Sequence, residues 1–177
     1  PYSASKAASD LLVKAWHRTY NLPVIITHSG NNFGPYQNKE KLIPKTIINI
    51  LKGKNIPIYG KGNQIRNWIY VDDNISALQK IILKGVIGQS YNIGGKKELS
   101  NINLVKYICF LISKIKNQKN SQKYLDLIKF VKDREGHDAK YSLNNDKIKK
   151  LGWIEETNFE KALLKTINWY IKKLNEL

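Results

Sequence analysis

The sequence predicts an α/β fold, the end of a doubly wound parallel-sheet domain followed by a smaller α+β lobe. Short β-branched runs alternate along the chain with longer segments whose apolar residues recur at helical spacing. Turns rich in Gly, Asn and Pro separate these segments. The chain has no evident internal repeat and no clear linker, so its 177 residues form one domain or part of a larger one.

The first quarter predicts helix, strand, loop and helix in that order. Ser3 is a plausible N-cap for a helix that ends near residues 20–21, before Pro23. The β-branched run 24–28 is typical of a buried strand in a parallel sheet. Residues 29–36 are turn formers and predict a loop, and residues 41–52 predict a second helix.

The middle of the chain predicts three short strands. They cover residues 57–59, 66–71 and 90–93. A turn at residues 60–63 separates the first two strands. Asp72 or Asp73 is expected to cap a helix that continues through Leu83.

The last third predicts mainly helices. Residues 102–116 carry an apolar face, residues 117–123 form a polar loop, and residues 127–131 are a strand candidate. A short helix is expected at 146–151. The spacing Thr157-x-x-Glu160 is that of a capping box, and the helix it opens is expected to reach about Leu174.

Composition excludes several functional classes. The net charge is +16, with 30 Lys and Arg against 14 Asp and Glu. The lysines are scattered, and no zinc-finger or helix-turn-helix signature accompanies them, so we expect no nucleic-acid partner. Cys109 is the sole cysteine, which excludes an internal disulfide and a cysteine-based zinc site. We expect no metal site, no membrane partner and a cytoplasmic location, since the longest apolar runs are only four or five residues.

Tyr2 and Lys6 are four residues apart at the start of the first predicted helix, which places them on one face. A nearby ammonium stabilises a phenolate. A tyrosine activated in this way can take a proton from a sugar hydroxyl. The alternative is an exposed helix start in which the two residues are neighbours by chance.

Arg66 and Arg134 are two of only three arginines in a lysine-rich chain. Arginine offers a bidentate fork that suits a phosphate, although a surface ion pair is an equal alternative. Tyr59 adjoins the turn at residues 60–62, where its ring could stack on a base or pack in the core. His137 could bind a phosphate or a sugar, but a lone histidine is more often structural.

Seven segments together resemble the extended short-chain dehydrogenase/reductase family, and within it the dTDP-glucose 4,6-dehydratases. They occur in the family's order, at family-like spacing, over nearly the whole chain. The segments are residues 1–6 (PYSASK), 29–35 (SGNNFGP), 40–44 (EKLIP), 57–62 (PIYGKG), 66–73 (RNWIYVDD), 91–95 (YNIGG) and 133–138 (DREGHD).

The resemblance implies a role for each matching residue. Tyr2 would be the catalytic base and Lys6 its partner, and both would face a bound NAD together with Ser3, Ala4, Ser5 and Asn32. The nucleotide-sugar substrate, dTDP-glucose, would meet Asn31, Lys41, Leu42, Pro57, Ile58, Tyr59, Arg66, Asn101, Asp133, Arg134, Glu135, Gly136 and His137, with Asn92 a weaker candidate.

The resemblance also implies a reaction and a domain plan. The sugar is oxidised at C4, loses water across C5 and C6, and is reduced at C6, as in the biosynthesis of rhamnose-type surface polysaccharides. Residues 1–56 would end an NAD-binding Rossmann domain whose N-terminal half is missing. Residues 57–177 would be mainly the nucleotide-sugar-binding lobe, interleaved with returning Rossmann elements. A homodimer is expected through the opening helix.

Departures from the family pattern leave alternatives open. A glycine-rich NAD-binding turn and the dehydration acid and base are absent from the sequence. The chain is therefore expected to be an excerpt of a longer enzyme, inactive by itself. The alternatives are a decayed remnant, a binding module without catalysis, or a related nucleotide-sugar epimerase or decarboxylase. Phe33 and Glu135 also differ, where the family usually has Tyr and Pro.

Overall fold

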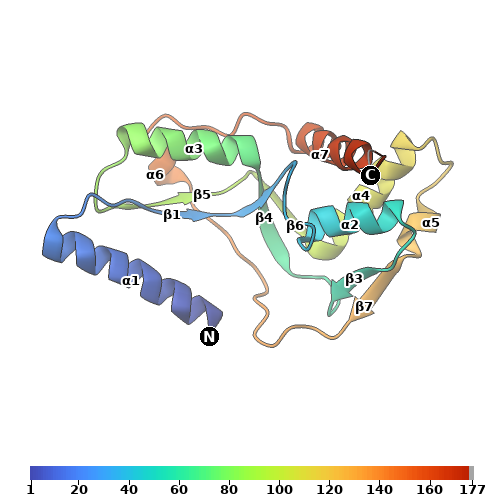
Figure 1. The fold of residues 1–177 in the computed structure, drawn as a ribbon, viewed down its shortest axis with the longest axis horizontal. Coiled ribbons are helices and arrows are strands. Elements are labelled where there is room, and N and C mark those ends of the chain that lie inside the picture. The colour runs from blue at the N-terminus through green and yellow to red at the C-terminus, as the bar shows by residue number, and fades with distance from the viewer. Residues whose placement is uncertain (176–177) are drawn as a thin grey trace.

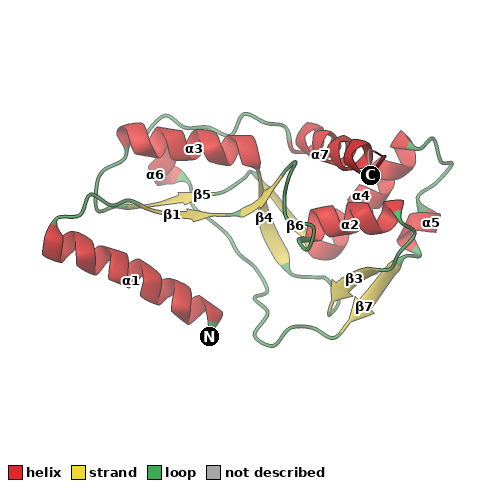
Figure 2. Cartoon of the chain, in the orientation of Figure 1, coloured by secondary structure: helices red, strands yellow, loops and turns green. Residues whose placement is uncertain are grey.

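The computed structural model describes residues 1–175 as helices around three small groups of paired strands (Figures 1 and 2). The first element is α1 (Tyr2–Tyr20), the longest helix within the described residues. Strand β1 (Ile26–Ser29) then pairs in parallel with β5 (Ser90–Ile93). Helix α3 (Val71–Lys84) packs over these strands. The predicted α/β class is confirmed.

A three-stranded sheet lies at the centre of the molecule. Strand β4 (Ile65–Tyr70) pairs in parallel with β2 (Asn31–Phe33) and antiparallel with β6 (Lys97–Ser100). Strand β3 (Ile56–Tyr59) pairs in parallel with β7 (Ile128–Val131), which comes from the last third of the sequence. This last pairing brings residues 59 and 131 into register, and so places the loop after β7 beside the turn after β3.

The remaining helices enclose the larger of two apolar clusters. Helices α2 (Leu42–Leu51), α4 (Asn101–Ile115) and α7 (Phe159–Asn175) pack on one another, with β3 and β4 beneath them. The smaller cluster joins α3 and β5 to the short helix α6 (Asp146–Lys149). A second short helix, α5 (Gln122–Leu125), follows α4. The division at residues 56 and 57 stays a prediction.

Gly95 fixes the approach of β4 to the end of β5. A Cβ atom at Gly95 would fall 1.8 Å from the Trp68 main-chain oxygen, so only glycine fits there. The buried Asn67 side chain accepts from the Gly95 N–H at 2.7 Å and donates to the Gly95 oxygen at 2.6 Å. Both main-chain groups of Gly95 are therefore satisfied inside the protein.

Helix starts differ from several expectations. Pro1 precedes α1 and Ser3 lies inside that helix, so Ser3 is not its N-cap. Tyr70 is the N-cap of α3, and Asp72 and Asp73 lie in its first turn. Asn158, rather than Thr157, accepts from a first-turn N–H of α7, that of Lys161, at 3.1 Å. The N–H of Thr157 is directed to Asp73 Oδ1 at 3.3 Å, which explains why its capping box does not form.

Two strands form where the sequence predicted none, the first of them inside the predicted loop at residues 29–36. Residues 31–33 form β2 because β4 provides a parallel partner, with Asn31 opposite Trp68. Residues 97–100 form β6 on the other edge of β4. The predicted strand at 24–28 is shorter and more exposed than expected, since β1 begins at Ile26 and only that residue is buried. No helix within residues 1–175 is long and apolar enough to cross a membrane.

Candidate functional site

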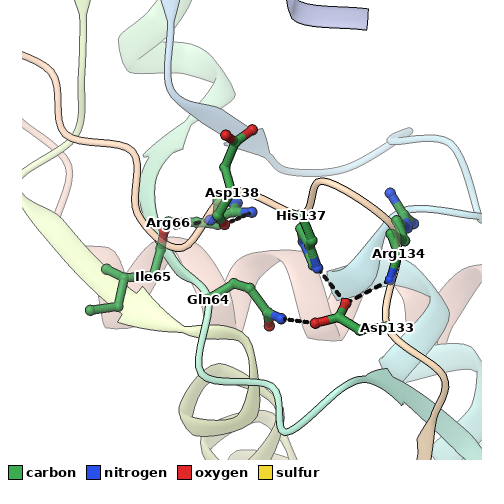
Figure 3. A network of polar contacts seen from close by, with 7 residues as sticks. All are labelled: Gln64, Ile65, Arg66, Asp133, Arg134, His137 and Asp138. Carbon is green, nitrogen blue, oxygen red and sulfur yellow. Dashed lines mark hydrogen bonds and ion pairs between the residues drawn. The ribbon is translucent and has the colours of Figure 1, made fainter. Parts of the chain in front are cut away.

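A loop between β7 and α6, residues 133–138, carries the densest polar network among the predicted site residues (Figure 3). Asp133 is its centre. Its Oδ1 accepts from His137 Nδ1 at 2.7 Å and from the Arg134 N–H at 2.8 Å. Its Oδ2 accepts from Gln64 Nε2 at 2.8 Å. The hydrogen bond from His137 is the main cause that lowers the pKa of Asp133 below its usual range.

The turn after β3 is shaped to receive Asp133. Gly60 has a φ of +56°, a conformation that L side chains rarely adopt. A Cβ atom at Gly60 would lie 2.5 Å from Asp133 Oδ2. The Gly60 N–H also donates to the Val131 oxygen at 2.9 Å. The glycine therefore lets the 133–138 loop close against β3.

Arg134 and Tyr59 form the exposed edge of this network. The guanidinium carbon lies 4.4 Å from the centroid of the Tyr59 ring, within cation–π range. Pro57 is half-buried and Ile58 is buried, so Tyr59 is the exposed member of the predicted trio. Glu135 and Gly136, whose φ is +66°, form the exposed tip of the loop. A planar, anionic ligand at this edge would meet an aromatic ring and a cation together.

Arg66 is buried, with only 6% of its surface exposed. Nη1 donates to the Ile65 oxygen at 2.8 Å and Nη2 to the Asp138 oxygen at 2.9 Å. The guanidinium also lies over the Tyr141 ring, 4.6 Å from its centroid. The Tyr141 hydroxyl donates to the Asp138 carboxylate, and this bond is the main cause that raises the pKa of Tyr141. Arg66 thus holds the 138–141 segment in place, a role that its sequence position alone does not reveal.

Tyr2 and Lys6 lie on the first turns of α1, and both are exposed. The hydroxyl of Ser5 donates to the Tyr2 oxygen at 2.8 Å, which satisfies one carbonyl of that turn. The N-terminal end of α1 is directed toward the loop that follows β7 (Figure 1).

Asn31 and Asn32 lie on β2, against β4. Asn32 Nδ2 donates to the Gly30 oxygen at 3.3 Å, and the Asn32 oxygen accepts from Gln37 Nε2 at 2.7 Å. Its side-chain oxygen, Oδ1, is buried and has no hydrogen-bond partner within the described chain. A buried acceptor of this kind needs a donor. Within the described residues, the protein itself supplies no donor to this Asn32 oxygen.

The other predicted contacts are at element starts or inside strands. Lys41 is the N-cap of α2 and Leu42 its first residue. Asn101 is the first residue of α4, and its N–H donates to the Gln64 oxygen at 3.1 Å. Asn92 lies within β5, at its pairing with β1. The structure thus brings Tyr59, Arg66, Asn101 and the 133–138 loop together around Gln64, and it leaves α1 without a buried residue.

Two residues that the sequence interpretation missed belong to this network. Gln64 lies two residues before Arg66, and residues with this spacing point to one side of a strand, a signal that could have found it. Tyr141 had no signal, because its role depends on Arg66 lying beneath its ring. A separate cavity of about 660 Å³ lies around residues 142–146 and 153–155 and contains none of the predicted site residues.

The family is decided by comparison of the whole sequence. The sequence model described as GDP-mannose 4,6 dehydratase matches residues 1–166. The chain belongs to this family. This match includes all seven segments, and the resemblance that they indicated is confirmed.

Similar proteins share both sequence and fold with this family member. A dTDP-glucose 4,6-dehydratase of Haemophilus influenzae is 53% identical over 97% of this chain and 52% of its own length. A solved dTDP-glucose 4,6-dehydratase of Streptomyces venezuelae, described with NAD bound, is 38% identical. Its structure superposes on this chain with a TM-score of 0.89, and the match covers 99% of this chain and 52% of the solved one. A UDP-glucuronic acid 4-epimerase of Bacillus cereus has a TM-score of 0.83 at 25% identity, over 98% of this chain and 53% of its own length. The chain spans about half the length of the curated relatives it matches.

Proposed function

We propose that this chain forms the catalytic-tyrosine and nucleotide-sugar-binding part of an NAD-dependent dTDP-glucose 4,6-dehydratase. The reaction converts dTDP-glucose to dTDP-4-dehydro-6-deoxyglucose and water. The observation that carries the proposal is the polar network in which Asp133 holds His137 and Arg134 beside Tyr59. The identity of about 50% to dTDP-glucose 4,6-dehydratases supports this substrate class.

One buried atom of this chain, the side-chain oxygen of Asn32, is suited to a hydrogen bond with bound NAD. Asn32 Oδ1 is a buried acceptor without a partner in the described part of the chain, and a carboxamide N–H would satisfy it. Lys6 would hold a ribose hydroxyl, with Ser3, Ala4 and Ser5 along the same helical turn. When bound, the nicotinamide supplies hydride acceptance from the sugar and hydride return to it.

Tyr2 would act as the base that takes the proton of the hydroxyl at sugar C4. Lys6 follows Tyr2 by one helical turn, and its ammonium would stabilise the phenolate that results from deprotonation of the tyrosine. Loss of the C4 hydrogen as a hydride, together with the hydroxyl proton taken by Tyr2, would leave a carbonyl at C4. That carbonyl would acidify the proton at C5 and permit water to leave across C5 and C6.

The substrate's nucleotide end would lie along the network. Tyr59 presents an aromatic face for the base, and Arg134 and Arg66 supply cationic groups for the diphosphate. We assign supporting contacts to the remaining predicted residues, namely Asn31, Lys41, Leu42, Pro57, Ile58, Asn101, Glu135, Gly136 and His137. Asp133 is the exception, because both of its oxygens already accept hydrogen bonds from the protein.

A homodimer is part of the proposal. Leu11, Leu12 and Trp16 on α1 are more than half exposed, which is unusual for apolar side chains on one helix. A partner copy that covers part of this helix would remove them from water. The lone cysteine, Cys109, is buried, as a cytoplasmic location would allow.

A second candidate is a nucleotide-sugar 4-epimerase, favoured by the TM-score of 0.83 to the Bacillus cereus epimerase. The two activities differ in the mass of the product. The protein, as its cell produces it, is incubated with NAD and dTDP-glucose, and the products are analysed by mass spectrometry. A dehydratase yields a product lighter by one water, whereas an epimerase yields an isomer of unchanged mass. An unchanged mass would refute the dehydratase proposal.

A further inference from the structure

We propose that Gln64 is a positioning residue that sets the nucleotide-binding shape of the 133–138 loop. The inference rests on the proposed function, because it assumes that this loop holds the nucleotide. Gln64 has 8% of its surface exposed. Its Nε2 donates to Asp133 Oδ2 at 2.8 Å, and its Oε1 is buried without a partner within residues 1–175. The bond to Asp133 therefore fixes the orientation of the amide (Figure 3).

Asp133 relays this bond to the ligand-facing residues. With Oδ2 held by Gln64, Oδ1 is aimed at His137 Nδ1 and the Arg134 N–H. The donation from Nδ1 leaves Nε2 as the ring atom that is free to meet a ligand. The same hydrogen bonds seat Arg134 where it covers the Tyr59 ring. Without Gln64, the carboxylate would lose the donor that fixes its rotation.

Main-chain groups at and next to Gln64 form hydrogen bonds with two further segments. These segments are the start of α4 and the other end of the 133–138 loop. The Gln64 oxygen accepts from the Asn101 N–H at 3.1 Å. The next residue, Ile65, donates from its N–H to the Ala139 oxygen at 2.9 Å, and Arg66 reaches the Asp138 oxygen. Gln64 and the first two residues of β4 thus hold both ends of the loop. Gln64 is the one among them whose side chain contacts Asp133.

The first test replaces the donor while keeping the side-chain length. Gln64→Met removes the hydrogen bond, and Gln64→Glu places a second carboxylate against Asp133. The matched control is Gln122→Met, which breaks a bond of the same type, from Gln122 Nε2 to Asp126 Oδ1 at 2.7 Å, on an exposed helix. Dissociation constants for dTDP and for NAD are measured by calorimetry, and KM and kcat with dTDP-glucose.

We expect Gln64→Met to weaken dTDP binding and to raise KM by about tenfold, the typical effect of losing a hydrogen bond to a charged group. We expect Gln64→Glu to weaken dTDP binding more. NAD affinity and kcat should change by less than about twofold, and Gln122→Met should match the wild type in every measurement. Unchanged dTDP affinity in Gln64→Met would overturn the proposal, as would an equal loss of NAD affinity.

A double-mutant cycle tests whether Gln64 acts through Asp133. In an Asp133→Ala background, Gln64→Met should weaken dTDP binding by less than about twofold, because the relay is already broken. Fully additive losses would contradict the relay.

Hydrogen exchange of the Arg134 amide separates this inference from the proposed function. If the wild type binds no dTDP and forms no dehydrated sugar, the proposed function fails. The exchange still tests Gln64. Gln64→Met should accelerate exchange of this amide relative to Gln122→Met, and equal rates would refute the positioning role.

Discussion

The guanidinium carbon of Arg134 lies 4.4 Å above the ring centroid of Tyr59, although the two residues are 75 positions apart in the sequence. The parallel pairing of β3 with β7 creates this contact, because it places Tyr59 opposite Val131, three residues before Arg134. The result is an aromatic face and a cation at one edge of the candidate site. A thymine base with an attached diphosphate matches both groups.

Tyr59→Leu removes the aromatic face but keeps an apolar side chain. We expect dTDP binding to weaken by about fivefold to thirtyfold, since base–aromatic stacking and cation–π contacts each contribute about 1 kcal/mol at exposed sites. Tyr59→Phe keeps the ring and should bind within about twofold of the wild type. Calorimetric titration with dTDP measures both. Equal binding by the leucine variant would place the base elsewhere.

Tyr2→Phe removes the hydroxyl that we assign to proton abstraction. Turnover of dTDP-glucose should fall by about 10²- to 10⁴-fold, the usual contribution of a general base. Binding of dTDP should stay nearly intact, because we assign the nucleotide to β3, β4 and the loop after β7. Single-turnover kinetics and calorimetry on the same sample check the two halves of this prediction. Retained turnover would remove Tyr2 from the mechanism.

Arg66→Lys keeps the charge but loses the planar fork. One ammonium cannot reproduce the two bonds of Arg66, to the Ile65 and Asp138 oxygens, and its stacking on Tyr141. The variant should weaken dTDP binding by about tenfold or more and lower the melting temperature, because it leaves a buried charge with fewer partners. Lys140→Arg, at an exposed ion pair with Glu98, is the control that should change neither. Unchanged dTDP affinity in Arg66→Lys would show that the fork is dispensable.

Gly95→Ala tests the packing of β4. The new Cβ atom would lie 1.8 Å from the Trp68 oxygen, a main-chain atom that cannot move without breaking the sheet. We expect the free energy of unfolding to fall by about 4 kcal/mol or more. Gly53→Ala meets no atom within 4 Å and carries only the strain of a φ of +62°, about 1–2 kcal/mol. Denaturant titration measures the free energy of unfolding of both variants. Equal losses in Gly95→Ala and Gly53→Ala would contradict the packing argument.

The lowered pKa of Asp133 predicts how the stability of the 133–138 loop changes at acid pH. Its pKa is lowered, chiefly by the hydrogen bond from His137, so the carboxylate stabilises the folded loop fully above its ordinary value of about 3.9. That stabilisation is lost as the pH falls through the lowered value. The melting-temperature difference between the wild type and Asp133→Asn should therefore stay constant down to about pH 5 and shrink below about pH 4. A melting-temperature difference that grows toward acid pH would contradict the claim that the ionised Asp133 carboxylate stabilises the loop.

The fold was predictable where local pattern and tertiary partners agree. The helix predicted over residues 41–52 is observed at 42–51, and the strand predicted over 57–59 is observed at 56–59. Residues 97–100 carry charge and follow two glycines, so nothing local indicates a strand; pairing with β4 creates it. Thr157 has the spacing of a cap, but its N–H is directed to Asp73, which lies 84 residues earlier in the chain.

The candidate site was predictable as a set of segments but not as a network. Arg66 and Arg134 are rare residues in a lysine-rich chain, and their motifs identified the segments. The contacts that organise them connect positions far apart in sequence, such as Gln64 with Asp133 and Arg66 with Asp138. The pairings of β3 with β7 and of Ile65 with Lys140 create these contacts, and local sequence encodes neither. Asp133 anchors the loop through hydrogen bonds from Gln64, Arg134 and His137, and its role as a substrate contact stays a prediction.

The measurement that tests the account most directly follows one hydrogen atom. dTDP-glucose carrying deuterium at C4 of the sugar is incubated with the protein and NAD, and the product is examined by mass spectrometry and NMR. The proposed reaction predicts a product lighter by one water, with a carbonyl at C4 and the deuterium at C6. A product of unchanged mass, with deuterium still at C4 and the hydroxyl inverted, would contradict the dehydratase account and establish an epimerase.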